Sequence, residues 1–228
     1  MEIKDGFMAT PVLRGFTEIK KLYEIVKFHK CMICGGYVRY MISQRKKVHP
    51  ADDIDIYCPN MDAYNQLAED LKQLGFEVQM ETEVALSFKK RKEPEWIACP
   101  KVQLIKAKNQ GAIVATGPIW DILESFDFSV VRCGLYDENT AIADAHFLED
   151  DNSGKVRIKN IHCPISSMAR CMKYRVKGFY TSPRESLKLF LDWEQRDDDY
   201  RQKISDMLQR DDLSKEEVDQ LEALLRID

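Results

Sequence analysis

Two glycines and two aspartates are the residues of this chain whose types and spacing best suit chemistry on a phosphate. Gly35 and Gly36 follow a short apolar segment, and Asp53 and Asp55 alternate with isoleucines further along. Glycines at the end of a strand let backbone N–H groups approach a phosphate closely, because no Cβ stands in the way. Aspartates two residues apart on a strand point to the same face. There they can hold divalent metal ions against a triphosphate, while the isoleucines face a core.

The elements that must position these residues follow from hydrophobic periodicity and from capping signals. Residues 17–29 are expected to form an amphipathic helix, with Thr17 as its N-cap. The double glycine is expected to join a strand to a helix whose N-terminus carries a partial positive charge suited to phosphate. Further helices and strands are predicted along the first 150 residues: strand 31–34, helix 37–43, strand 53–58, helix 61–74 ending at Gly75, strands 77–80, 84–89, 102–105 and 113–116, a helical turn at 120–123, strand 128–136 and its hairpin partner 142–147.

The character of the sequence changes after residue 155. Asp150 to Gly154 is a turn-rich stretch that predicts a linker. Beyond it, Pro183 and Ser214 are helix start signals, and periodicity predicts a mostly helical tail. Its expected helices cover 164–177, 184–195, 198–209 and 214–226. The predicted organisation is therefore one domain over residues 1–155 and a helical C-terminal region over 156–228.

Composition excludes several classes of protein. The 228 residues are 44% hydrophobic, which is enough for a core and too many for a disordered chain. No apolar run approaches the roughly 20 residues of a membrane span, and the N-terminus has no signal-peptide pattern. We therefore expect a cytoplasmic protein with no membrane partner. The seven scattered cysteines are expected to be free thiols, and the lone pair Cys31 and Cys34 is not expected to bind zinc.

The net charge of −4 argues against a global basic field for nucleic acid. Any RNA contact must then come from local patches. The two candidates are Arg45-Lys46-Lys47 and the run from Lys89 to Lys92, and both also fit ordinary solvated loops.

The segment Gly35-Gly36-Tyr37-Val38-Arg39, followed by Asp53-Ile54-Asp55-Ile56, resembles the signature of the nucleotidyltransferase superfamily. Within it, the chain is most similar to the head domain shared by class II tRNA nucleotidyltransferases (CCA-adding enzymes) and bacterial poly(A) polymerases. Looser resemblances follow in the same order, at Phe126 to Val130, Ala141 to Asp144 and Ile165 to Phe179. The resemblance implies an α+β fold: a polymerase-beta-like head with a mixed sheet flanked by helices, followed by a small helical tail.

The resemblance also implies roles for individual residues. Gly35 and Gly36 would hold the triphosphate through backbone amides, and Arg39 would pair with a phosphate. Asp53 and Asp55 would bind two Mg²⁺ ions, of which one activates the attacking hydroxyl and the other stabilises the pyrophosphate leaving group. Asp127 would contact the nucleotide ribose or organise the nucleotide pocket, and Arg170 would lie near the base.

The chain departs from the pattern of these relatives at several positions. Tyr40 stands where they have an acid after the arginine, and no Glu-Asp pair precedes Arg170. Gln103 lies on the strand where a third carboxylate is common in the superfamily. Glutamine cannot act as a general base, so the acceptor hydroxyl would rely on the metal or on Asp55.

The sequence therefore predicts a Mg²⁺-dependent enzyme that transfers an NMP from an NTP to an acceptor hydroxyl and releases pyrophosphate. The expected acceptor is the 3′ end of an RNA, with tRNA as one candidate. Two alternatives stay open. One is NMP transfer to a protein or small molecule, and the other is a catalytically silent nucleotide-binding protein of the same fold. A protein partner is also considered, because the helical tail is short.

Overall fold

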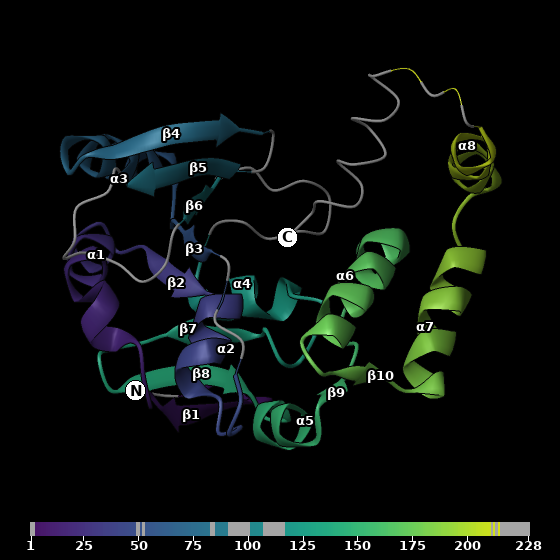
Figure 1. The fold of residues 1–228 in the computed structure, drawn as a ribbon, viewed down its shortest axis with the longest axis horizontal. Helices are drawn as coiled ribbons and strands as arrows, with labels where there is room; N and C mark the ends of the chain where they lie inside the picture. Colours follow the sequence, from purple (N-terminus) through teal and green to yellow (C-terminus); the bar gives the residue numbers. More distant parts are fainter. Residues whose placement is uncertain are drawn as a thin grey trace. The chain divides into compact units, whose positions relative to one another are not determined.

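The computed structural model describes residues 3–48, 51, 53–82, 85–90, 101–106, 117–210, 212 and 214. Within these residues, eight strands form one sheet in the order β1-β8-β7-β2-β3-β6-β5-β4 (Figure 1). The pairing of β3 with β6 is parallel, and the other pairings in this sheet are antiparallel. The strands are β1 (Phe7–Pro11), β2 (Met32–Cys34), β3 (Ile54–Tyr57), β4 (Phe76–Glu81), β5 (Ala85–Lys90), β6 (Val102–Ile105), β7 (Cys133–Leu135) and β8 (Thr140–Asp144).

Helices cover the two faces of the sheet unequally. The larger core joins one face of the sheet to α1 (Phe16–Phe28), α2 (Gly36–Ile42) and α3 (Met61–Gln73). The smaller core lies on the opposite face, where α4 (Ile119–Ser125) packs through Ile122 and Leu123 against Cys34 and Tyr57. Gly134 on β7 permits this approach, because a Cβ there would lie 3.0 Å from Cδ1 of Ile119.

Most of the predicted elements are confirmed, and so is the α+β class with a mixed sheet. The helix predicted over 61–74 is α3. The Asn60 side chain caps its start by accepting from the Ala63 N–H at 2.9 Å, and Gly75 follows its end with φ +83°. The strand predicted over 102–105 is β6. Two predicted elements, strand 113–116 and helix 214–226, lie outside the described residues apart from Ser214.

Three local predictions are wrong. Gly15, in a left-handed conformation, is the N-cap of α1 in place of Thr17. Only Cys133–Leu135 of the strand predicted over 128–136 is a strand, because Phe128 to Arg132 form a turn. The expected linker beginning at Asp150 lies mostly inside helix α5 (Phe147–Ser153). Its acidic and polar composition reflects buried hydrogen bonding and not a solvated turn.

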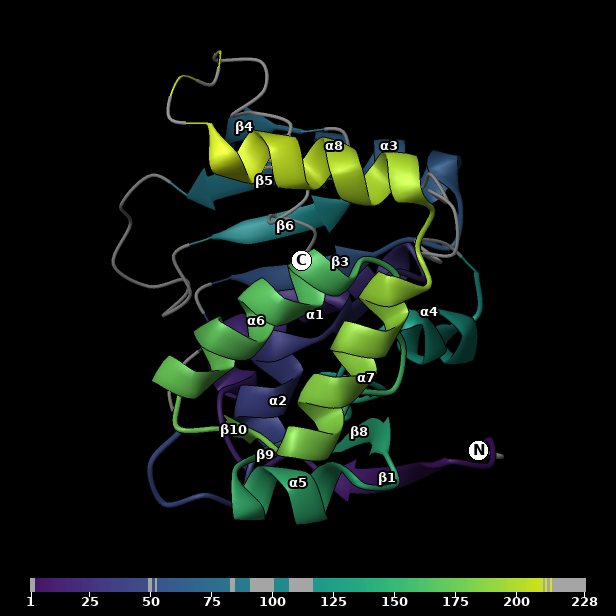
Figure 2. The same ribbon diagram turned by 90° about the vertical axis from the view of Figure 1, so that its right-hand side faces the viewer.

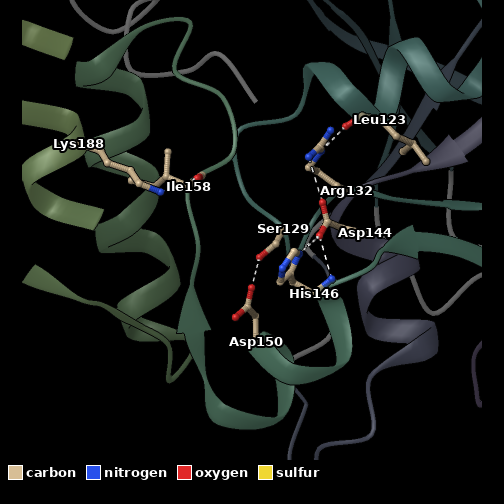
Figure 3. A network of polar contacts seen from close by, with 8 residues as sticks. All are labelled: Leu123, Ser129, Arg132, Asp144, His146, Asp150, Ile158 and Lys188. Carbon is tan, nitrogen blue, oxygen red and sulfur yellow. Dashed lines mark hydrogen bonds and ion pairs between the residues drawn. The ribbon is translucent and has the colours of Figure 1, made fainter. Parts of the chain in front are cut away.

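A buried polar network explains why the acidic residues of α5 face inward. Asp150 and Asp151 are 0% and 1% exposed. The Ser129 hydroxyl donates to Asp150 at 2.6 Å, as Figure 3 shows. The Ser43 hydroxyl donates to Asp151, whose other oxygen lies 3.6 Å from the Arg39 guanidinium. Because buried charges need partners, this network ties α5 to the C-terminal end of α2.

The chain divides into two compact units, Met1–Ser153 and Gly154–Asp228. In the second unit, β9 (Lys155–Val156) pairs in parallel with β10 (Tyr180–Thr181), and three helices follow or intervene (Figure 2). These are α6 (Pro164–Val176), α7 (Pro183–Glu194) and α8 (Asp198–Gln209). Glu185 on α7 accepts the Ile158 N–H at 2.7 Å and fixes the loop before α6. Within the described part of the chain, none of the helices combines the length and apolar character that crossing a membrane requires.

The buried ion pair of Arg39 with Asp151 gives a stability prediction. We expect Asp151→Ala to lower the free energy of unfolding by about 3 kcal/mol, because it leaves the Arg39 guanidinium buried without this carboxylate. Urea denaturation measures the change. The control is Glu69→Ala, which removes an exposed ion pair with Lys72 and should cost less than about 0.5 kcal/mol. Equal effects of the two substitutions would contradict the structural role of Asp151.

Candidate active site on the α4 face of the sheet

The turn from β2 into α2 is built on the conformation of Gly35. Its φ of 80° and ψ of −138° are accessible almost only to glycine. Its N–H donates to the Cys133 carbonyl at 2.8 Å, which joins the end of β2 to β7. Gly35 thus allows the turn by its conformation, but its N–H is already used in the bond to Cys133. The first backbone N–H of α2 that could donate to a phosphate is that of Gly36. A Cβ built at Gly36 would meet no atom within 4 Å, so this side of the turn is open.

The aspartates of β3 follow the alternation that the sequence predicts. Ile54 and Ile56 are 0% exposed and belong to the larger core, while Asp53 and Asp55 are half-buried. Both carboxylates therefore belong to the α4 face. A Cβ built at Gly35 would lie 3.5 Å from Oδ2 of Asp55. The structure thus brings the glycine turn and the second aspartate together.

Cys34 is the strand partner of Asp55 on β2. The side chain is fully buried, and burial raises the pKa of the thiol well above its ordinary value, with Cys133 and the Asp55 carboxylate adding to the effect. A thiol must lose its proton to bind a metal. The buried Cys34 therefore packs beside Asp55, and its raised pKa favours the protonated thiol.

Gln103 is the strand partner of Asp55 on β6, and only 9% of it is exposed. In the amide orientation that satisfies both neighbours, its nitrogen donates to Oδ1 of Asp55 at 3.1 Å. Its oxygen accepts from Nζ of Lys101 at 3.2 Å. The sequence indicated Gln103 as a substitute for an acid, but it gave no sign of these two contacts.

The segment after α4 brings Phe126 and Asp127 towards the same turn. The Phe126 ring would lie 3.6 Å from a Cβ at Gly35, and its centroid is 5.5 Å from that of Tyr57. Asp127 follows directly and is 3% exposed. The sequence places Phe126 in a segment that loosely resembles the superfamily, but it did not predict a role for this side chain.

The two arginines selected from the sequence lie in different surroundings. Arg39 is 2% exposed and faces Asp151, so the structure shows it in an internal ion pair. Arg170 lies on α6, in the second compact unit. The predicted contacts of Arg39 with a phosphate and of Arg170 with a base stay predictions.

A second polar cluster, which the sequence did not indicate, lies at the end of β8. Asp144 is 1% exposed, and its Oδ2 accepts from Arg132 at 3.0 Å. Its Oδ1 accepts from the backbone N–H of His146 at 2.9 Å and lies 3.1 Å from Nδ1 of the same ring (Figure 3). Arg132 also donates to the Leu123 carbonyl at 2.9 Å. This cluster fastens α4 to the sheet and thereby supports the face that carries Asp55.

The donor set at Asp53 and Asp55 fits a hard divalent cation. Both side chains offer carboxylate oxygens, which Mg²⁺ prefers, and both remain partly accessible. Among the described residues, no group of three or more His, Cys, Asp or Glu side chains is arranged to hold a metal. A cation at this position would therefore need oxygens from a bound nucleotide, as is common for Mg²⁺.

Solved structures with a similar fold are tRNA-processing and CCA-adding enzymes. A tRNA-processing enzyme aligns with a TM-score of 0.50 at 18% identity, over 78% of this chain and 47% of the other. A CCA-adding enzyme with CTP aligns with a TM-score of 0.50 at 14% identity, over 84% and 47%. The CCA-adding enzyme of Thermotoga maritima complexed with tRNA aligns with a TM-score of 0.51 at 13% identity, over 81% and 46%. The chain thus spans about half the length of these enzymes, and at this identity the likeness establishes the nucleotidyltransferase fold alone.

A comparison with curated proteins finds no significant match. The sequence profile of one family, described as Gabija anti-defense 2 family protein, matches residues 9–154. This is well over half of the chain. The chain belongs to the Gabija anti-defense 2 family. The match ends one residue beyond the first compact unit, so the sequence features of this anti-defense family lie in the unit that contains the glycine turn and β3.

Membership of this family refines the resemblance noted from the sequence. The predicted superfamily fold is supported by the solved structures. The closer relation to CCA-adding enzymes and poly(A) polymerases is not established, because the identity to these solved structures is 18% or less and the matching family is described as Gabija anti-defense 2.

The two glycines of the turn give a matched pair of stability predictions. Gly35→Ala places a Cβ on a backbone with φ +80°, and we expect it to lower the free energy of unfolding by about 2 kcal/mol. Gly36 has no positive φ and open space around it, so Gly36→Ala should leave stability unchanged or raise it by up to about 1 kcal/mol. Thermal and urea unfolding measure both. A Gly36→Ala protein as unstable as Gly35→Ala would contradict this description of the turn.

Proposed function

We propose that this anti-defense protein is a metal-dependent nucleotidyltransferase, which transfers an NMP from an NTP to an acceptor hydroxyl and releases pyrophosphate. The observation that carries the proposal is the position of the Asp55 carboxylate directly beside the glycine turn, on the face of the sheet with the smaller core. The fold shared with CCA-adding enzymes supports it.

In this proposal, some residues bind the phosphates and Mg²⁺, and others orient the nucleotide. The Gly36 amide at the start of α2 would donate to a phosphate oxygen, since the first N–H groups of a helix have no intrahelical acceptor. Asp53 and Asp55 would hold Mg²⁺, which when bound supplies charge neutralisation for the triphosphate and lowers the pKa of the acceptor hydroxyl. Asp127 would orient the nucleotide from the segment that follows α4, and the contact of Arg170 with a base stays a prediction from the resemblance. Orientation and electrostatic stabilisation account for most of the catalysis in such reactions.

The acceptor predicted from the sequence is an RNA 3′ end, with tRNA as one candidate. The tRNA complex of the T. maritima CCA-adding enzyme supports that assignment only through a shared fold. The family name favours a second candidate acceptor, because it describes a role against Gabija. In that case the NMP would be transferred to a hydroxyl on a component of the Gabija system.

A transfer assay tests the function and separates the acceptors. The protein is incubated with each α-labelled NTP, Mg²⁺ and either total RNA or purified Gabija components. We expect one acceptor to be labelled, EDTA to abolish labelling and excess Mg²⁺ to restore it. Asp53→Asn and Asp55→Asn should each lower the rate by at least about 100-fold, which corresponds to roughly 2.7 kcal/mol of transition-state stabilisation.

The matched control is Asp62→Asn, which changes an exposed aspartate in the first turn of α3. It should leave the rate unchanged. Labelled RNA would support the acceptor predicted from the sequence, and labelled Gabija protein would support the second candidate. Nucleotide binding without labelling of either would refute the transferase and favour a catalytically silent nucleotide-binding protein.

A further inference from the structure

Asp55, Gln103 and Lys101 form a continuous chain of polar contacts across two neighbouring strands. Asp55 and Gln103 are directly opposite each other in the parallel pair of β3 and β6. Lys101 precedes Gln103 by two residues, so both side chains leave the same face of the sheet. The Ile54 N–H donates to the Lys101 carbonyl at 3.1 Å and continues this pairing to the start of β3.

The chemistry of the three groups allows one orientation of the central amide. A lysine ammonium only donates hydrogen bonds, and a carboxylate only accepts them. The Gln103 oxygen must therefore face Lys101, and its NH₂ group must face Asp55, as the 3.2 Å and 3.1 Å contacts require. A glutamate here would satisfy Lys101 but would repel Asp55, and an alanine would contact neither.

These contacts decide which oxygen of Asp55 faces the glycine turn. Oδ1 is held by the Gln103 amide, and Oδ2 lies over Gly35. Because Gln103 is 9% exposed and packed between β5 and β3, its own side chain has little freedom. The carboxylate of Asp55 is thereby fixed in direction before any ligand binds.

We propose that Gln103 is a positioning residue for the divalent cation at Asp53 and Asp55, and that Lys101 sets the direction of its amide. The inference rests on the proposed function, because it assumes that Asp55 binds a metal–nucleotide complex. Gln103 does not replace a missing carboxylate as a ligand. It acts through Asp55, in the way that outer residues orient the ligands of other metal sites.

Direct metal binding tests this role without reference to turnover. Mn²⁺ is titrated into the full-length protein with a non-hydrolysable ATP analogue, and free Mn²⁺ is followed by electron paramagnetic resonance. We expect Gln103→Ala to weaken Mn²⁺ binding by about 10-fold or more, as is usual when the partner of a metal ligand is removed. Lys101→Met should weaken it by about 3-fold, and Lys101→Arg, which keeps a donor, should restore binding.

A double substitution distinguishes positioning from a general effect on the strand. If Lys101 acts through Gln103, Lys101→Met should add nothing in the Gln103→Ala background. Lys106→Met is the matched control, because Lys106 follows the same strand but pairs with Glu81. It should bind Mn²⁺ as the unchanged protein does. Thermal unfolding of every variant checks that each is folded. If Gln103→Ala does not fold, the Mn²⁺ affinity of Lys101→Met tests the positioning role.

The outcomes separate this inference from the proposed function. Native Mn²⁺ affinity in folded Gln103→Ala, or additive losses in the double variant, would overturn the positioning role. Weakened Mn²⁺ binding in Gln103→Ala, together with no transfer by the unchanged protein to any acceptor, would refute the transferase and leave the positioning role standing. Unchanged Mn²⁺ binding in Asp55→Asn would refute the metal site. It would therefore refute both the positioning role of Gln103 and the proposed function.

Discussion

The hydrogen-bonded pairing of β3 with β2 on one side and β6 on the other is the constraint on which the candidate site depends. It places residue 55 beside the end of β2, where the glycine turn begins, and opposite Gln103 on β6. Side chains alternate along a strand, so a shift of one residue in either pairing would turn Asp55 into the core and Ile54 or Ile56 towards solvent. The 0% exposure of both isoleucines opposes such a shift and fixes the register.

Burial on the opposite face gives the site a rigid base. Helices α1, α2 and α3 cover that face with a large apolar core, so the backbone beneath Asp53 and Asp55 is packed on one side. On the site's own face, Arg132 holds α4 through the Leu123 carbonyl and is itself paired with Asp144. The polar network of Asp150, Asp151, Ser43 and Arg39 anchors the far end of α2. The charged groups of this network fix the elements that surround the site.

Fold and family carry different information about this protein. The likeness to CCA-adding enzymes reaches a TM-score of 0.51 at 13% identity, which describes a scaffold. The anti-defense family covers the same scaffold from residue 9 to residue 154. One fold can serve many reactions by changing the residues around a conserved frame. At the candidate site of this chain, the strand partner of Asp55 is the neutral Gln103, which also contacts Lys101.

The sequence by itself determined the local features of the site. Alternation of acids and isoleucines in 53–56, the strand-to-helix turn at Gly35-Gly36 and the periodicity of 61–74 are short-range patterns, and each produced the expected element. Only the tertiary structure decided the contacts of Gln103 with Asp55 and of Arg39 with Asp151, because these contacts join segments far apart in the chain. For the same reason, the sequence predicted a linker at residues 150–153. In the structure these residues belong to helix α5, which is buried against Ser129 and Ser43. The local sequence pattern determines on which face of an element a side chain lies. The long-range pairing of strands and packing of helices determine which residues that side chain contacts.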